Sequence, residues 1–178
     1  MKSKKSILIP IALVVGLMSS STPSFAASTT TLVIPVTKNP IVNKSKGVGF
    51  AILSAQVQDN TDPKNGTPIA DRLALKVRNT TKKAITTFEI YYTMFDTVTK
   101  TSESYYQRLK PFSIPANSIG YIAFDNAKGP GHFPENTYSI YRNSKNEVKF
   151  TIELSASGFK PQFTSALKAK GTTENPNG

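Results

Sequence analysis

The chain has 178 residues, with 22 lysines and arginines against 11 acidic residues, and a formal net charge of +11. This length suits one domain with a sizeable hydrophobic core. The absence of cysteine excludes thiol nucleophiles, disulfide frameworks and cysteine-ligated metal centres, and there is a single histidine.

The first 26 residues have the three regions of a secretory signal peptide. A basic start over 1–5 precedes an apolar run over 7–18, and a small, polar stretch then ends at Ala26. The apolar run is well short of the roughly 20 residues that cross a bilayer. We expect cleavage after Ala26 and export to the periplasm or the medium, with no transmembrane segment in the mature protein. Its charge is about +8 without the leader lysines, and an exported domain without cysteine is more typical of bacteria.

Residues 27–47 are expected to form an N-terminal arm. They are rich in Ser, Thr, Lys, Asn and Pro, with one candidate strand over 31–37 and a loop over 38–47. Pro35 lacks the N–H group that a ladder needs, so this strand belongs at a sheet edge.

From residue 48 onward, apolar and polar residues alternate as they do in half-buried strands. The expected strands cover 48–57, 72–78, 88–95, 102–109, 119–124, 138–141, 148–155 and 159–167. The mature sequence shows no convincing helical period, and frequent turn signals are typical of a sandwich or barrel. We therefore expect an all-β, immunoglobulin-like antiparallel β-sandwich of seven to nine strands over 48–168, and a disordered tail over 169–178.

The segment from Leu75 to Asp96, LKVRNTTKKAITTFEIYYTMFD, resembles a known pattern. It is similar to the strand–Asn-turn–strand–Asp signature of bacterial secreted immunoglobulin-like modules of the FxLYD kind, although no glycine follows closely after Asp96. The resemblance implies a non-catalytic envelope or surface module with no cofactor. In that pattern Asn79 and Asp96 form turns, and no functional residue carries over.

His132 lies in a Gly- and Pro-rich loop over 125–136, and any Ser–His–acid machinery would have to use it. No Gly-x-Ser-x-Gly elbow accompanies it. Packing between Pro130 and Pro134 explains the histidine more simply. A hydrolase centred on His132 is therefore the weaker alternative.

Three further groups of residues could in principle carry chemistry. Asp125, His132 and Glu135 share one loop and could bind a metal ion, although such sites usually use two histidines. The other two are a set of oxygen ligands that could bind calcium and a pair of carboxylates that could hydrolyse a glycoside. The carboxylate pair would require that its two strands lie side by side. These two groups are Asp59, Asp62 and Asn65 for calcium, and Glu89 with Glu153 for hydrolysis. Turn formation and outward strand charges explain all of them, and we expect no metal and no cofactor.

Aromatic and basic side chains on outward strand faces suggest a binding surface. Tyr91 falls opposite the core-facing residues of its strand, and either Tyr105 or Tyr106 must also point outward. Such rings beside basic residues could stack a sugar or contact a protein, unless the N-terminal segment covers that face. The candidate binding residues are Arg72, Lys76, Arg78, Tyr91, Tyr105, Arg108, Lys110 and His132.

The sequence thus favours an exported, non-catalytic binding module of the bacterial cell envelope. Its positive charge suits an anionic polymer or protein partner, and the signal peptide argues against nucleic acid as the physiological ligand. One alternative is a structural or assembly subunit, like those of adhesins and filaments, in which the Pro-bearing strand of the arm completes a neighbour's sheet.

Overall fold

The computed structural model describes residues 35–61, 68–125, 127–134, 140 and 144–170, except for the side chains of residues 58–61 and 68–72. All the elements named within these residues are strands. They are β1 (Phe50–Thr61), β2 (Pro68–Asn79), β3 (Phe88–Asp96), β4 (Ser102–Arg108), β5 (Ile119–Phe124), β6 (His132–Phe133), β7 (Val148–Ala156) and β8 (Phe159–Lys168). No helix in this part of the chain is long and apolar enough to cross a membrane.

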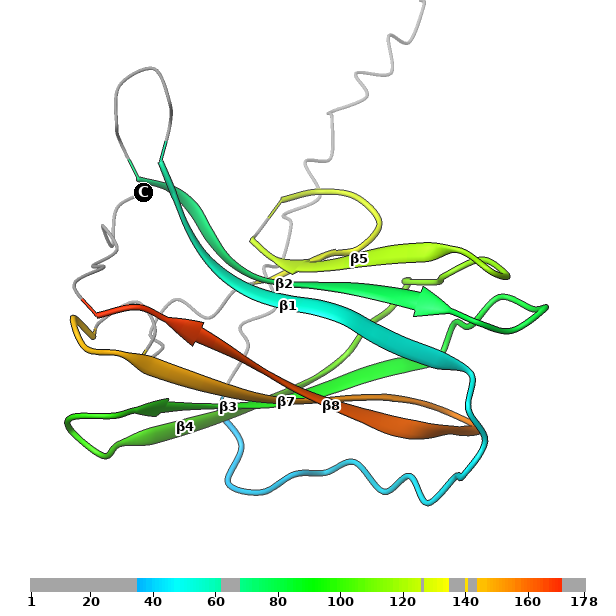
Figure 1. Ribbon diagram of the computed structural model, residues 1–178, viewed down its shortest axis with the longest axis horizontal. Helices are drawn as coiled ribbons and strands as arrows, with labels where there is room; N and C mark the ends of the chain where they lie inside the picture. Colours follow the sequence, from blue (N-terminus) through cyan, green and yellow to red (C-terminus); the bar gives the residue numbers. More distant parts are fainter. Residues whose placement is uncertain (1–34, 62–67, 126, 135–139, 141–143, 171–178) are drawn as a thin grey trace, which may run out of the picture.

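The strands form two facing sheets, in the orders β1-β2-β5-β6 and β4-β3-β7-β8 (Figure 1). We call them the first and the second sheet. Neighbouring strands pair antiparallel apart from the short parallel contact of β6 with β5. The orders β1-β2-β5 and β4-β3-β7-β8 correspond to strands A-B-E and C′-C-F-G of an immunoglobulin-like domain. The expected all-β sandwich is confirmed.

The core lies between the two sheets and is rich in aromatic rings. Tyr92 sits within it, with ring centroids 5.6 Å from those of both Tyr105 and Phe124 and 6.5 Å from that of Phe150. Alternate residues of each central strand point inward, because successive side chains of a strand leave opposite faces. Burial of these apolar side chains is the main favourable contribution to folding.

The strand boundaries differ from the expected ones in several places. The β1–β2 ladder continues to the pair Thr61–Pro68, so polar residues that look turn-forming extend both strands. The two-residue strand β6 was not expected. The short strand expected over 138–141 lies outside the described residues apart from Ile140, as do residues 171–178 of the expected tail.

Asn79 and Asp96 both shape turns at strand ends. The Asp96 carboxylate accepts hydrogen bonds from the N–H groups of Val98 and Thr99, each at 2.9 Å, in the turn between β3 and β4. The Asn79 side-chain oxygen accepts a hydrogen bond from the N–H of Thr81 at 2.8 Å. A short polar side chain that bonds to backbone two or three residues ahead is a common way to fix a turn.

The described part of the N-terminal arm, residues 35–47, contains no strand and runs across the outer face of the second sheet (Figure 1). The Val36 N–H donates to the carbonyl oxygen of Ser104 on β4 at 2.8 Å. Further along, the Asn39 amide donates to the Glu153 carboxylate at 2.6 Å. The Asn43 amide then donates to the Ser155 hydroxyl at 2.9 Å. Most of the edge strand expected over 31–37 lies outside the described residues.

Candidate functional site

The structure does not assemble the expected aromatic and basic patch. Lys76 and Arg78 lie on β2 and point to the outer face of the first sheet, whereas Tyr91 lies on the outer face of the second. Residues 80–87 carry the chain from the first sheet to the second. Because the two sheets pack against each other, their outer faces point in opposite directions. Arg72 also lies on β2, but its side chain is outside the described part of the structure.

Tyr105 requires a correction, because it faces the core and is only 2% exposed. It pairs in register with Tyr92, which already points inward. Its hydroxyl donates to the Glu103 carboxylate at 2.8 Å, and burial raises the pKa of Tyr105 well above its usual range. The outward ring is Tyr106, whose hydroxyl donates to Glu89 at 2.8 Å.

The outer face of the first sheet keeps one aromatic and basic pair. The Lys76 ammonium lies 5.8 Å from the ring centroid of Tyr121 on the neighbouring strand β5, and Tyr121 is 62% exposed. Sequence reasoning missed Tyr121, because β5 is short and the tyrosine lies between Gly120 and Ile122. A cation above an exposed ring contributes only modestly to stability.

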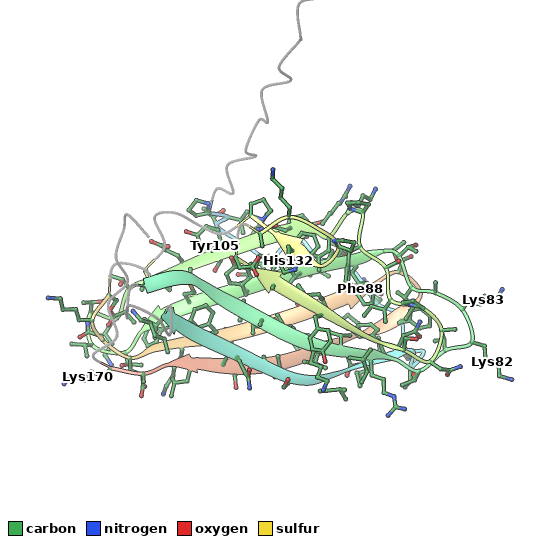
Figure 2. All side chains as sticks on the ribbon, turned by 90° about the horizontal axis from the view of Figure 1, so that it is seen from above. Lys82, Lys83, Phe88, Tyr105, His132 and Lys170 are labelled. Atoms are coloured by element: carbon green, nitrogen blue, oxygen red, sulfur yellow. The ribbon has the colours of Figure 1, made fainter. Side chains whose placement is uncertain are left out.

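Exposed cations gather instead at one end of the sandwich, which we call the basic end. β1 begins there, β2 and β4 end there, and β3 and β8 begin there, as the pairs Phe50–Asn79 and Glu89–Arg108 indicate. Lys82 and Lys83 project from this end, and Lys170 lies at the opposite end (Figure 2). The exposed cations of the basic end are Lys44, Lys46, Arg78, Lys82, Lys83, Arg108, Lys110 and Lys160.

Glu89 is the one acid of the basic end among the described side chains, and hydrogen bonds already engage it. It accepts from the hydroxyls of Tyr106 at 2.8 Å and Ser155 at 3.3 Å. One carboxylate among these exposed cations compensates only a small part of their charge, so this end of the sandwich presents a net positive charge to solvent. Arg78, Arg108 and Lys110 were among the expected binding residues. The lysines were missed, although the adjacent pair Lys82-Lys83 in a turn is a readable signal.

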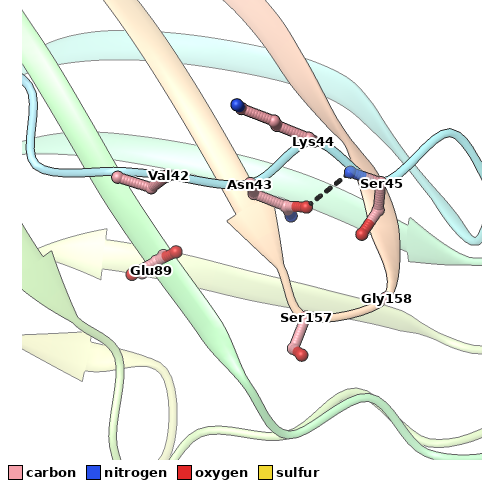
Figure 3. Close-up of a pocket in the computed structure, with 7 residues that line it drawn as sticks. All are labelled: Val42, Asn43, Lys44, Ser45, Glu89, Ser157 and Gly158. Atoms are coloured by element: carbon pink, nitrogen blue, oxygen red, sulfur yellow. Dashed lines mark hydrogen bonds between the residues drawn. The ribbon is translucent and has the colours of Figure 1, made fainter.

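A polar pocket of about 480 Å³ opens at the basic end, between the arm and the turn that joins β7 to β8 (Figure 3). The Asn43 side-chain oxygen accepts from the Ser45 N–H at 3.0 Å and holds the arm in a tight bend there. This bend places Lys44 beside the pocket. The lining residues are Val42, Asn43, Lys44, Ser45, Glu89, Ser157 and Gly158.

His132 lies on β6, where its Nδ1 is 3.0 Å from both oxygens of the buried Asp125 carboxylate. The fold therefore brings Asp125 and His132 together, which are two of the three residues of the expected metal group. The third, Glu135, lies outside the described residues. His132 and Lys110 line the same hollow of about 370 Å³, with Phe112 and Phe133. In the described chain, the imidazole has no hydroxyl among its hydrogen-bond partners.

Among the described residues, no three side chains of His, Asp or Glu come together in a group that could hold a metal ion. The expected calcium group has its side chains outside the described part of the structure; its residues are Asp59, Asp62 and Asn65. β3 and β7 do pair, but Glu89 lies opposite Ser155 and Glu153 lies opposite Tyr91. The two carboxylates are thus diagonal neighbours rather than directly facing, and each has its own partner, Tyr106 or Asn39.

No family model matches the sequence, and no curated protein matches it either. Among solved structures, the chain is similar to Pseudomonas fluorescens alkylpurine DNA glycosylase AlkC bound to DNA containing an abasic site analog. That match has 13% identity and a TM-score of 0.35, and it covers 67% of this chain and 31% of that one. The chain is also similar to Spo0M, a sporulation control protein from Bacillus subtilis, at 12% identity and a TM-score of 0.36, covering 70% of this chain and 50% of that one. Likenesses this remote say nothing about what the chain binds or does.

Proposed function

We propose that the protein is an exported, non-catalytic binding module of the bacterial cell envelope, and that its basic end binds an anionic polymer. The observation that carries this proposal is the gathering of exposed lysines and arginines at one end of the sandwich, where Glu89 is the only described acid. A concentrated field of one sign attracts polyanions more strongly than the same charges spread over the surface. The leader-like first 26 residues support the export part of the proposal.

The non-catalytic part rests on the partners of His132. Its Nδ1 faces Asp125, as in a catalytic triad, but no nucleophilic hydroxyl of the described chain completes the arrangement. A histidine fixed by a buried carboxylate also serves simply to hold a loop in place. We assign His132 this positioning role in the loop over 125–133.

The test is sedimentation of the purified protein with isolated bacterial envelopes and, separately, retention on immobilised polyglutamate. Both are measured at low and at high salt. Binding through exposed charges weakens as added salt shortens the screening length from about 30 Å at 0.01 M to about 3 Å at 1 M. Binding to both supports that is lost at high salt supports the proposal. Failure to bind either at low salt overturns it.

Two triple variants with the same change in net charge make the test specific. One removes charge from the basic end, as Lys46→Gln, Lys82→Gln and Lys83→Gln, and the control removes it elsewhere, as Lys128→Gln, Lys145→Gln and Lys170→Gln. All six lysines are exposed. At about 0.2–1 kcal/mol for each exposed ion pair, the first triple is expected to weaken polyglutamate binding about three-fold to a hundred-fold. Equal weakening by both triples would mean that net charge alone is responsible, against a dedicated basic end.

A further inference from the structure

Three side chains form a row across the outer face of the second sheet. Tyr91 on β3 pairs in register with Glu153 on β7, and Glu153 pairs in register with Phe163 on β8. Residues directly opposite one another in antiparallel strands point to the same face. The Glu153 carboxylate is therefore flanked by an aromatic ring on each side.

The spacing of this row suits a small cation. Neighbouring strands lie about 4.8 Å apart, so the backbones that carry Tyr91 and Phe163 are about 9.6 Å apart, with Glu153 midway. A cation held at Glu153 would thus have a ring-bearing strand about 4.8 Å away on each side, and an ammonium group is attracted to a ring face within roughly 6 Å of its centroid. A carboxylate between two rings supplies both charge and ring contacts for one positive group.

The row lies in a hollow that is open to solvent. A pocket of about 260 Å³ is lined by all three residues, together with Asn39 of the arm, Thr151, Ile152 and Thr164. Phe163 is 71% exposed, so most of its ring surface is open to solvent at the pocket. Asn39 donates to Oε2 of Glu153, and in the described chain Oε1 makes no hydrogen bond. One carboxylate oxygen is thus held in place by the arm, in a residue that lines the pocket.

We propose that this pocket binds the ammonium group of a small alkylammonium compound, with Glu153 as counter-ion and Tyr91 and Phe163 as walls. Charge complementarity selects this ligand class. The pocket lining contains a carboxylate and no lysine or arginine, in a protein whose other exposed charges are mostly positive. The pocket is separate from the basic end and takes a ligand of the opposite sign, so the two sites can be tested independently.

The experiment is a titration of the purified protein with choline, with tetramethylammonium, and with 3,3-dimethylbutan-1-ol, the neutral carbon isostere of choline. Binding is followed by calorimetry and by amide chemical shifts in nuclear magnetic resonance. Both cations are expected to bind with dissociation constants on the order of millimolar, as suits so few ligand atoms. They are expected to shift the amides of residues 91, 153 and 163. The isostere is expected to bind at least about tenfold more weakly, because it gains no cation–π or ionic attraction.

Two variants with matched controls locate the site. Phe163→Ala and Glu153→Gln are each expected to weaken choline binding about three-fold to thirty-fold. In Glu153→Gln the side-chain carbonyl can still accept the hydrogen bond from Asn39, so the arm stays attached. The controls are Phe95→Ala, which truncates a ring on the same face outside the pocket, and Glu147→Gln, which removes an acid paired with Lys149. Both controls are expected to leave choline affinity unchanged.

Three results would overturn the proposal. These are equal binding of the neutral isostere, unchanged choline affinity in both pocket variants, and no saturable binding of either cation. In each case the row would be only a packing feature of the sheet surface. None of these results bears on polyglutamate retention, so failure here leaves the proposed function of the basic end standing.

Discussion

The side-chain amide of Asn79 donates a hydrogen bond to the backbone carbonyl oxygen of Ile114 at 2.9 Å, and both residues are fully buried. The same nitrogen lies 2.8 Å from the carbonyl oxygen of Lys83 and 3.0 Å from that of Pro115. One side chain thus ties the loop between β2 and β3 to the segment that crosses from β4 to β5. Because that loop carries Lys82 and Lys83, Asn79 positions part of the basic end.

Replacing Asn79 should be among the most destabilising single changes in the chain. Asn79→Leu removes the hydrogen bonds from the amide to three backbone carbonyl oxygens and takes away the acceptor of the Thr81 N–H, which together cost about 3 kcal/mol in the free energy of unfolding. Asn79→Asp should cost more, because a carboxylate would then face the same carbonyl oxygens. Urea denaturation followed by circular dichroism measures both. The exposed Thr86→Ala serves as control and should change the free energy by about 0.5 kcal/mol or less. An Asn79→Leu variant as stable as that control would contradict this account.

Asp96 should make stability depend on acid pH. The Ser144 hydroxyl, 2.5 Å from the carboxylate, holds the pKa of Asp96 well below its usual range, and the Asn146 amide and the N–H groups of Thr99 and Val98 act in the same direction against the effect of burial. A lowered pKa in the folded state means that the charged carboxylate stabilises the fold above the unfolded-state pKa of about 3.9. That stabilisation is lost progressively as the pH falls below this value.

The measurement for Asp96 is the urea midpoint from pH 7 down to the acid limit of folding. The urea midpoint of the wild type should decrease once the pH is below about 4. The urea midpoint of Asp96→Asn should be lower than that of the wild type at pH 7 and should decrease less steeply with acid. The half-buried Glu147, whose carboxylate has no comparable set of hydrogen bonds, provides the control, and Glu147→Gln should keep the wild-type profile. Identical slopes for wild type and Asp96→Asn would show that other carboxylates dominate the acid response.

Gly131→Ala and Gly158→Ala are a matched pair of variants. The added methyl group would contact backbone atoms at residue 131 and would have open space around it at residue 158. Both have positive φ, at 87° and 85°. A Cβ on Gly131 would lie 2.3 Å from the carbonyl oxygen of Tyr121, whereas a Cβ on Gly158 would have nothing within 4 Å. Gly158→Ala should cost about 1–2 kcal/mol for the left-handed conformation alone.

Gly131→Ala carries the same conformational cost plus a clash of about 1–3 kcal/mol with backbone that cannot move aside. It should also release β6, because Gly131 accepts the hydrogen bond from the Ala123 N–H at 2.7 Å. Thermal denaturation gives the two costs, and amide hydrogen exchange at Ala123 reports on β6. Equal destabilisation by both variants would mean that the loop adjusts around the added methyl group.

Local alternation predicted which side chains of a strand face the core, as Leu73, Leu75 and Val77 of β2 illustrate. It did not predict which strands share a sheet, because pairing depends on contacts between residues far apart in the sequence. For this reason Arg78 and Tyr91 were expected on one surface and lie on opposite ones. The row of Tyr91, Glu153 and Phe163 was hidden for the same reason, since β3 and β7 are separated by more than 50 residues of sequence.

Tyr105 and Tyr106 show a second limit of sequence reasoning. The two are adjacent, and β4 has polar residues on both faces, so alternation alone does not say which ring is buried. The register with Tyr92 decides the question in favour of Tyr105. Long-range register therefore determines both the composition of the core and the composition of the candidate sites.

The arm covers the outer face of the second sheet without belonging to it. It is attached there mainly by the side-chain amides of Asn39 and Asn43 and by one backbone hydrogen bond from Val36. Lifting residues 35–43 would break these few bonds and leave every ladder between β3, β4, β7 and β8 intact. Access to this face is thus energetically separable from unfolding, and a ligand or protease that competes for the arm works against a small local cost rather than against the stability of the domain.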